Sequence, residues 1–228
     1  MRTKALILTA VLGVAAATTA SAQVFSQNAV GYYNLTLGSG FTMIANQLNN
    51  GDNNLNTILP VVPDGSTFLT WNAAGQMFSG GDIHFAGAGW FDSATITPST
   101  TVLGPGIGGF INLPVGASAT VTMVGEVPQG TLTLDLAPNF QMISHMTPQE
   151  LGMEASGFPA GDGDTILFWN PPAQSYDSAF IYFAGAGWFD SAASVLADPV
   201  PSLGEAMFYN RGVGNGTATW TRNFSVNP

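Results

Sequence analysis

A ten-residue sequence, called the duplicated phrase below, occurs twice in this chain of 228 residues. It reads Phe-Ala-Gly-Ala-Gly-Trp-Phe-Asp-Ser-Ala at residues 85–94 and again at residues 183–192, an offset of 183 − 85 = 98. Other pairs repeat at offsets of 98 or 99: Trp71-Asn72 with Trp169-Asn170, Asn112 with Asn210, and Phe41, Met43 and Ile44 with Phe140, Met142 and Ile143. This period is domain-sized and exceeds the roughly 20 to 50 residues of solenoid and propeller repeats. The sequence therefore predicts a tandem duplication with homologous domains at residues 23–126 and 127–228.

The N-terminus has the pattern of a secretory signal peptide over residues 1–22. Arg2 and Lys4 supply positive charge, an apolar stretch follows from Ala5, and Ala20-Ser21-Ala22 fits an A-x-A cleavage site. The apolar stretch is shorter than the roughly 20 residues that span a bilayer. We therefore expect cleavage after Ala22, export to the extracellular space, the periplasm or the cell surface, and no membrane insertion.

The mature chain is strongly acidic and contains no lysine. Without residues 1–22, only Arg211 and Arg222 oppose 14 carboxylates, which gives 2 − 14 = −12. Binding to nucleic acid needs a cationic surface, so the charge balance argues against a nucleic-acid partner. Charged residues are only 8% of the chain, so most of its surface is neutral and polar, which suits contact with neutral glycans or with copies of the same protein. The absence of cysteine means that no disulfide framework supports the fold.

Short strand patterns separated by Gly, Pro, Asn and Asp run along the whole mature chain. Apolar and polar residues alternate at 119–124, 131–136 and 217–221, the period of a half-buried strand. Runs rich in aromatic and β-branched residues occur at 30–37, 41–48, 67–71, 83–85, 110–113, 140–146, 165–169, 180–183 and 207–209. This pattern predicts an all-β fold of two tandem β-sandwich or barrel-like domains.

One short helix is expected in each unit. Thr147-Pro148-Gln149-Glu150 places a capping threonine before a proline and a glutamate, and Asn53–Leu59 is the matching stretch of the first unit.

The two ends of the chain resemble each other. Phe25–Asn28 reads Phe-Ser-Gln-Asn, and Phe224–Asn227 reads Phe-Ser-Val-Asn. One interpretation is that the duplication point fell inside a strand. The other is self-association, with the C-terminal strand of one molecule meeting the N-terminal strand of the next.

The residues needed by several enzyme classes are missing from the mature chain. It has no lysine for a phosphate loop or a Schiff base, no cysteine nucleophile, and no G-x-S-x-G or H-E-x-x-H motif. The glycine-rich run at 104–109 leads into a strand-like segment and is interpreted as a turn. His84 aligns with Tyr182 and His145 with Asn46, so no histidine is shared by both units. We expect no catalytic residue, cofactor or metal.

The duplicated aromatic and acidic residues are the remaining candidates for a site. Adjacent strand residues point to opposite faces, so one member of Trp90-Phe91 and one of Trp188-Phe189 should face outward. An exposed indole could stack on a neutral sugar, whereas a buried one would fill the core. Asp92 and Asp190 could serve as the two carboxylates of a glycosidase or could simply cap turns. The candidate ligand-binding residues are Trp71, Asn72, Trp90, Asp92, Trp169, Asn170, Trp188 and Asp190.

Four phrases together carry a resemblance to a known group of proteins. They are FSQNAVGY at 25–32, GFTMIANQL at 40–48, VGEVPQG at 124–130 and WTRNFSVN at 220–227. The set resembles a family of uncharacterised, signal-bearing bacterial proteins built from two such β units, and the resemblance implies no activity or site. Relatives often carry a Pro-Gly-Glu-Gly-type turn before the strand of Phe110, whereas here only Gly204-Glu205-Ala206 in the second unit keeps the acid.

These observations predict a secreted, non-enzymatic structural protein of an extracellular layer, matrix or assembly. The leading alternative is an extracellular glycan-binding protein that uses exposed Trp90 and Trp188. The third is a glycoside hydrolase that uses Asp92 and Asp190.

Overall fold

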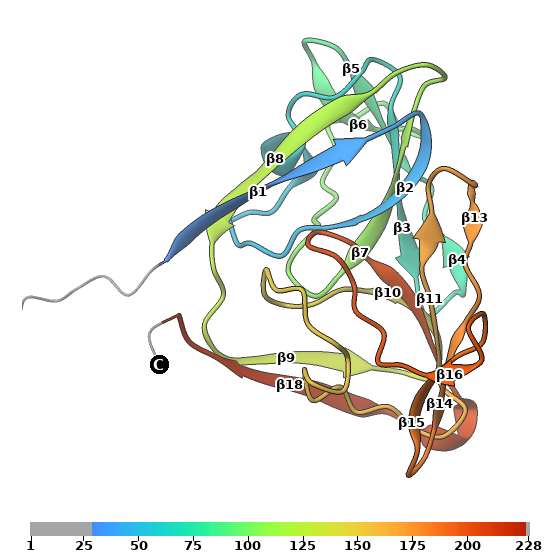
Figure 1. Ribbon diagram of the computed structural model, residues 1–228. Coiled ribbons are helices and arrows are strands. Elements are labelled where there is room, and N and C mark those ends of the chain that lie inside the picture. The colour runs from blue at the N-terminus through green and yellow to red at the C-terminus, as the bar shows by residue number, and fades with distance from the viewer. Residues whose placement is uncertain (1–28, 227–228) are drawn as a thin grey trace, which may run out of the picture.

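The computed structural model describes residues 29–226 (Figure 1). Strands make up 46% of the structure and helices 4%, and every strand ladder is antiparallel, so the prediction of an all-β fold is confirmed. The expected signal peptide at 1–22 and the segment Phe25–Asn28 lie outside the described residues, as does Asn227.

The N-terminal half, residues 29–126, contains a two-stranded ribbon and a larger sheet. The ribbon pairs β1 (Val30–Leu37) with β8 (Ala119–Glu126). The sheet has the order β2-β7-β3-β5-β6, with β4 paired to β3. Its strands are β2 (Gly40–Ala45), β3 (Thr67–Asn72), β4 (Met77–Phe78), β5 (Asp82–Phe85), β6 (Gly89–Asp92) and β7 (Gly108–Leu113).

The C-terminal half, residues 130–226, repeats this strand order. Its ribbon pairs β9 (Gly130–Leu136) with β18 (Ala218–Phe224). Its sheet runs β10-β17-β11-β14-β15-β16, and β12 pairs with β13. The strands are β10 (Asn139–Ile143), β11 (Thr165–Leu167), β12 (Trp169–Asn170), β13 (Ser175–Tyr176), β14 (Phe180–Phe183), β15 (Gly187–Asp190), β16 (Val195–Leu196) and β17 (Met207–Arg211), and the 3-10 helix η1 (Val213–Asn215) precedes β18. All ladders between named strands join strands of the same half.

Three apolar clusters follow from strand alternation. One lies between the ribbon and the sheet of the N-terminal half, and a second occupies the same place in the C-terminal half. The third lies where the two sheets face each other, so Ile44 and Ile111 point to the first core while Met43 and Phe110 point to the shared one. The molecule is thus layered as ribbon, sheet, sheet and ribbon, with the ribbons as the outer layers.

The expected short helix forms in the N-terminal half. Helix α2 (Leu55–Ile58) begins after Asn54, whose side chain accepts a hydrogen bond from the Asn56 backbone N–H.

The helix expected from Thr147-Pro148-Gln149-Glu150 is absent, and that prediction is wrong. The Glu150 carboxylate accepts a hydrogen bond from the backbone N–H of Leu203 (3.3 Å) and does not close a capping box. Residues 153–156, which align with α2 at an offset of 98, form turns instead of a helix. The turns end at Gly157, whose φ angle is +71°.

Candidate functional site

The duplicated phrase folds into a β-hairpin in each half, β5–β6 and β14–β15. In the first hairpin, Gly87 and Gly89 adopt φ angles of +78° and +97°, a region that favours glycine. The Asp64 carboxylate holds the turn by accepting a hydrogen bond from the Ala86 N–H (2.8 Å). Gly185, Gly187, Asp162 and Ala184 repeat this geometry in the second hairpin. The phrase is therefore explained by turn formation and packing.

The two tryptophans of the phrase fill the cores of the halves. Trp90 is 0% exposed and Trp188 is 2% exposed. The indole N–H of Trp90 donates to the Leu59 carbonyl (2.8 Å), and its backbone N–H donates to Asn56 Oδ1 (2.7 Å). Because no ring face is open to solvent, the assignment of Trp90 and Trp188 to glycan stacking is wrong. Strand alternation places the indoles inward and leaves the neighbouring phenylalanines on the other face.

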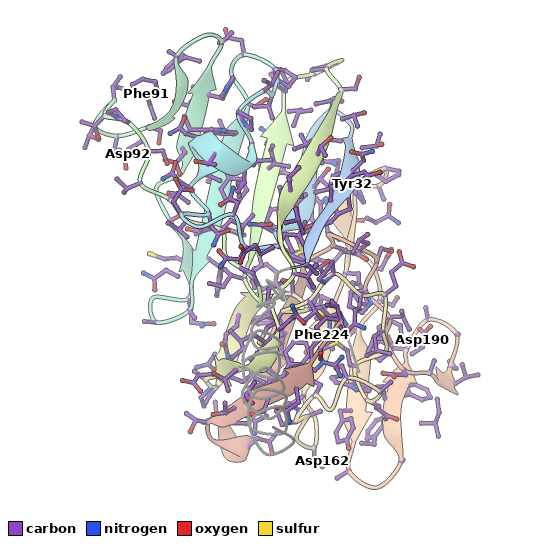
Figure 2. The ribbon with its side chains drawn as sticks, turned by 90° about the vertical axis from the view of Figure 1, so that its left-hand side faces the viewer. Tyr32, Phe91, Asp92, Asp162, Asp190 and Phe224 are labelled. Carbon is purple, nitrogen blue, oxygen red and sulfur yellow. The ribbon has the colours of Figure 1, made fainter. Side chains whose placement is uncertain are left out.

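The two duplicated aspartates cap separate turns. Asp92 Oδ1 accepts hydrogen bonds from Ala94 N (3.0 Å), Thr95 N (2.8 Å) and Thr95 Oγ1 (2.9 Å), and these bonds, led by the backbone one from Thr95, lower its pKa. Asp190 Oδ1 accepts from the backbone N–H groups of Ala192 and Ala193. Figure 2 shows Asp92 and Asp190 on opposite sides of the molecule. They do not flank a common substrate position, so the hypothesis of a glycosidase pair is wrong.

Trp71 and Trp169 join the halves to each other. The indole N–H of Trp71 donates to the Phe140 carbonyl, and that of Trp169 donates to the Phe41 carbonyl, both at 2.8 Å. The neighbouring Asn72 and Asn170 stay within their own turns, where their side-chain oxygens accept from the N–H groups of Gly75 and Ala173. These four candidate residues are engaged in structural contacts.

Two glutamines complete the contact between the halves and were not among the predicted residues. Gln174 Oε1 accepts from Phe41 N (2.8 Å) while its Nε2 donates to Phe41 O (2.9 Å). Gln76 makes the same pair of hydrogen bonds with Phe140 (3.1 and 3.0 Å). A signal was present in the sequence, since Gln76 and Gln174 are 98 residues apart like the duplicated tryptophans.

Loops also cross between the halves in a reciprocal manner. Ala45 N donates to Gly204 O (2.8 Å), and Ser144 N donates to Gly106 O (3.0 Å). The glycine-rich run at 104–109 thus forms the expected turn and also contacts the other half. The two halves meet through a nearly self-complementary interface, like that between the subunits of a C2 dimer.

The buried titratable side chains make structural contacts, and three of them, Asp164, Tyr209 and Arg211, form one hydrogen-bonded network. Arg211 forms a salt bridge with Asp164 (3.2 Å), and both contact the Tyr209 hydroxyl. Burial and the Asp164 hydrogen bond raise the pKa of Tyr209. His145 bonds through Nε2 to the Leu151 carbonyl (2.8 Å), and burial lowers its pKa. His84 is buried against Trp90, with ring centroids 5.2 Å apart.

An aromatic groove opens where the two sheets meet. It has a volume of about 270 Å³ and is lined by Trp71, Phe78, Phe140, Leu167, Tyr176 and Phe208. Residues of both halves form its walls, and Phe78 and Tyr176, which align at an offset of 98, are partly exposed. This concave feature contains one of the predicted site residues, Trp71.

Comparison with known proteins and structures gives no relative from which a role could be transferred. No protein-family model matches the chain, and no curated protein or solved structure matches it. Within residues 29–226, no group of three or more His, Cys, Asp or Glu side chains is placed to hold a metal ion. No helix in that range has the length and hydrophobicity needed to cross a bilayer.

Proposed function

We propose that this protein is a secreted, non-enzymatic structural protein that assembles head to tail through its outer ribbons. Export is inferred from the sequence of residues 1–22. The observation that supports assembly is that β1 and β18 each pair with one strand, β8 and β9 respectively, and no other described strand covers their outer edges. Open strand edges present unpaired N–H and C=O groups that can join a strand of another molecule.

The two ribbons differ in the side chains that they show to solvent. Tyr32 is 75% exposed on β1, with Val30 beside it and Val124 opposite on β8. The outward face of the β9–β18 ribbon is polar, and there Thr131 bonds to Asn223 and Thr219 to Asp135. Two different ribbons on opposite outer layers favour a heterologous contact, in which β18 of one molecule adds to β1 of the next and the array stays open.

The acidic charge of the chain opposes this association. Each molecule carries a formal net charge of −10 over the full sequence, so neighbouring copies repel one another at low ionic strength. Because salt screens repulsion between exposed charges, assembly should increase with added salt.

The proposal predicts a specific pattern in variants that carry a charge on one edge. Tyr32→Lys blocks the β1 edge and Thr221→Lys blocks the β18 edge, since a lysine on an edge strand opposes pairing. In light scattering after size exclusion, wild-type protein should form oligomers that grow with concentration, and each variant alone should be monomeric. An equimolar mixture of the two should form 1:1 dimers, because one intact β1 edge and one intact β18 edge remain.

Val61→Lys is the matched control, since Val61 is 78% exposed and lies outside both ribbons. It should assemble like the wild type. A wild-type protein that stays monomeric at every concentration and salt level would overturn the proposal, and homodimers of either single variant would overturn the heterologous contact.

A further inference from the structure

We propose that the aromatic groove between the two halves binds a small, free quaternary-ammonium solute. This site is separate from the ribbon edges proposed above for assembly.

The walls of the groove are rings set at large angles to one another. Trp71 is nearly perpendicular to Phe78 (80°) and to Phe208 (87°), with centroids 5.0 Å apart in both pairs. Phe208 also meets Tyr176 at 5.8 Å and 64°, and Phe140 at 5.9 Å and 87°. Because rings at such large mutual angles cannot all turn the same side to a shared space, we infer that both ring faces and ring edges line the groove. A cation within about 6 Å of a ring centroid is attracted by the negative face of that ring.

The rim of the groove is open while its floor is buried. Phe78 is 40% exposed and Tyr176 is 39% exposed, whereas Phe208 is buried. Phe78 and Tyr176 belong to β4 and β13, which come from different halves, so the groove exists only when the halves are together. A solute can therefore enter between two exposed rings and rest on a buried one.

The charge of the protein selects a cation over a neutral or anionic ligand. The described residues contain two cationic side chains besides histidine, Arg211 and Arg222, and neither lines the groove. Arg211 is bound to Asp164, and Arg222 donates to Gln149 Oε1 (2.9 Å). With a formal net charge of −10 over the chain, the field of the protein attracts cations.

The polarity of the lining selects a cation that needs no hydrogen bonds. The Trp71 indole N–H already donates to Phe140 O, so the Tyr176 hydroxyl is the main side-chain polar group left at the rim. Burial raises the pKa of Tyr176 to about 12, so this hydroxyl stays neutral at physiological pH. Sugar hydroxyls or the three N–H groups of a primary ammonium would lose hydrogen bonds to water without replacement. A quaternary ammonium has no N–H group and avoids that cost.

The size of the groove selects a small solute. A volume of about 270 Å³ lies slightly below the range of ordinary ligand pockets, roughly 300–1,000 Å³. It accommodates a group the size of tetramethylammonium or choline, and we therefore assign it to the free solute and not to a lipid headgroup in a bilayer.

The test is titration of the full mature protein with tetramethylammonium and with choline, followed by calorimetry and tryptophan fluorescence. Both should bind, and neopentyl alcohol, an uncharged molecule of similar shape, should bind at least about 5-fold more weakly. Tyr176→Leu and Phe78→Leu should each weaken tetramethylammonium binding between about 2-fold and 30-fold, the range expected for loss of one cation–π contact. Tyr176→Phe keeps the ring and should bind within about 2-fold of the wild type.

Phe183→Leu is the matched control, because Phe183 is an aromatic residue of β14 that is 44% exposed and lies outside the groove. It should bind like the wild type, and circular dichroism should show that every variant is folded. Equal affinity for neopentyl alcohol, or unchanged affinity in both leucine variants, would overturn the proposal. Binding to phosphatidylcholine vesicles without binding to free choline would overturn the assignment to a free solute.

Discussion

The buried ion pair of the C-terminal half has an uncharged counterpart in the N-terminal half. Asp164 and Arg211 are both almost fully buried, and the Tyr209 hydroxyl forms hydrogen bonds with both side chains. At an offset of 98, the residues that correspond to Asp164, Tyr209 and Arg211 are Ser66, Ile111 and Leu113. The same fold position is therefore filled by charged side chains in one half and by a serine and two aliphatic side chains in the other.

This difference predicts the stability of two variants. Arg211→Leu should lower the free energy of unfolding by about 3–5 kcal/mol, because it leaves the Asp164 charge buried without its partner. The triple variant Asp164→Ser, Tyr209→Ile, Arg211→Leu should lose less than half of that, because no uncompensated charge remains. Urea unfolding at neutral pH measures both, and a triple variant as unstable as the single one would contradict this account.

Among the elements, the second hairpin offers a comparison between two glycines. Gly185 and Gly187 have φ angles of +82° and +99°, but a Cβ at position 185 meets open space while one at position 187 would clash with Glu154 Oε1. That oxygen accepts the Trp188 backbone N–H (3.2 Å). Gly185→Ala should cost about 1–2 kcal/mol of stability from backbone strain, and Gly187→Ala should cost more because this hydrogen bond is also lost. Equal losses in thermal or urea unfolding would contradict the role of Glu154.

The elements also show how far sequence patterns determine the fold. The predicted strands at 30–37 and 180–183 match β1 and β14 residue for residue, because aromatic and β-branched residues gather at strand positions. The two-residue strands β4, β13 and β16 were missed, since a ladder that short has no detectable period. The helix predicted at 147–150 does not form, because the Glu150 carboxylate accepts a hydrogen bond from Leu203 in a loop that is distant in sequence. Local sequence does not reveal such a contact.

The candidate site was less predictable than the strands. The duplicated residues stand out in the sequence, but alternation shows only that Trp90 and Phe91 face opposite sides and does not show which side meets the core. The groove combines Trp71 with Phe208 and Tyr176 of the other half, and these contacts depend on how the two sheets pack. A single sequence contains no periodic signal for such packing.

At the scale of the whole molecule, both described chain ends lie against the link between β8 and β9 (Figure 1). Val127 N donates to Ala29 O (2.7 Å), and Val226 N donates to Gln129 Oε1 (3.1 Å). A circular permutant can therefore start at Gly130 and end at Glu126, with the original chain ends joined by a short Gly/Ser linker. This permutant should fold, and its free energy of unfolding should lie within about 2 kcal/mol of that of the parent protein.

Circular dichroism and urea unfolding test this permutant against one that is opened between Phe110 and Ile111, in the middle of β7. The second permutant interrupts a central strand and should not fold. An unfolded first permutant, or equal stability of the two, would contradict the arrangement of the chain ends.

The hydrogen bonding of the two arginines limits the cleavage of the folded protein by trypsin-like proteases. Trypsin-like proteases must draw an arginine or lysine side chain into their specificity pocket, and Arg211 and Arg222 are the sole residues of that kind after position 22. Arg211 is buried beside Asp164, and Arg222 is partly buried and bound to Gln149. Trypsin-like cleavage after either arginine therefore requires local opening of β17 or β18, which makes the folded protein inherently resistant to this class of protease at both positions.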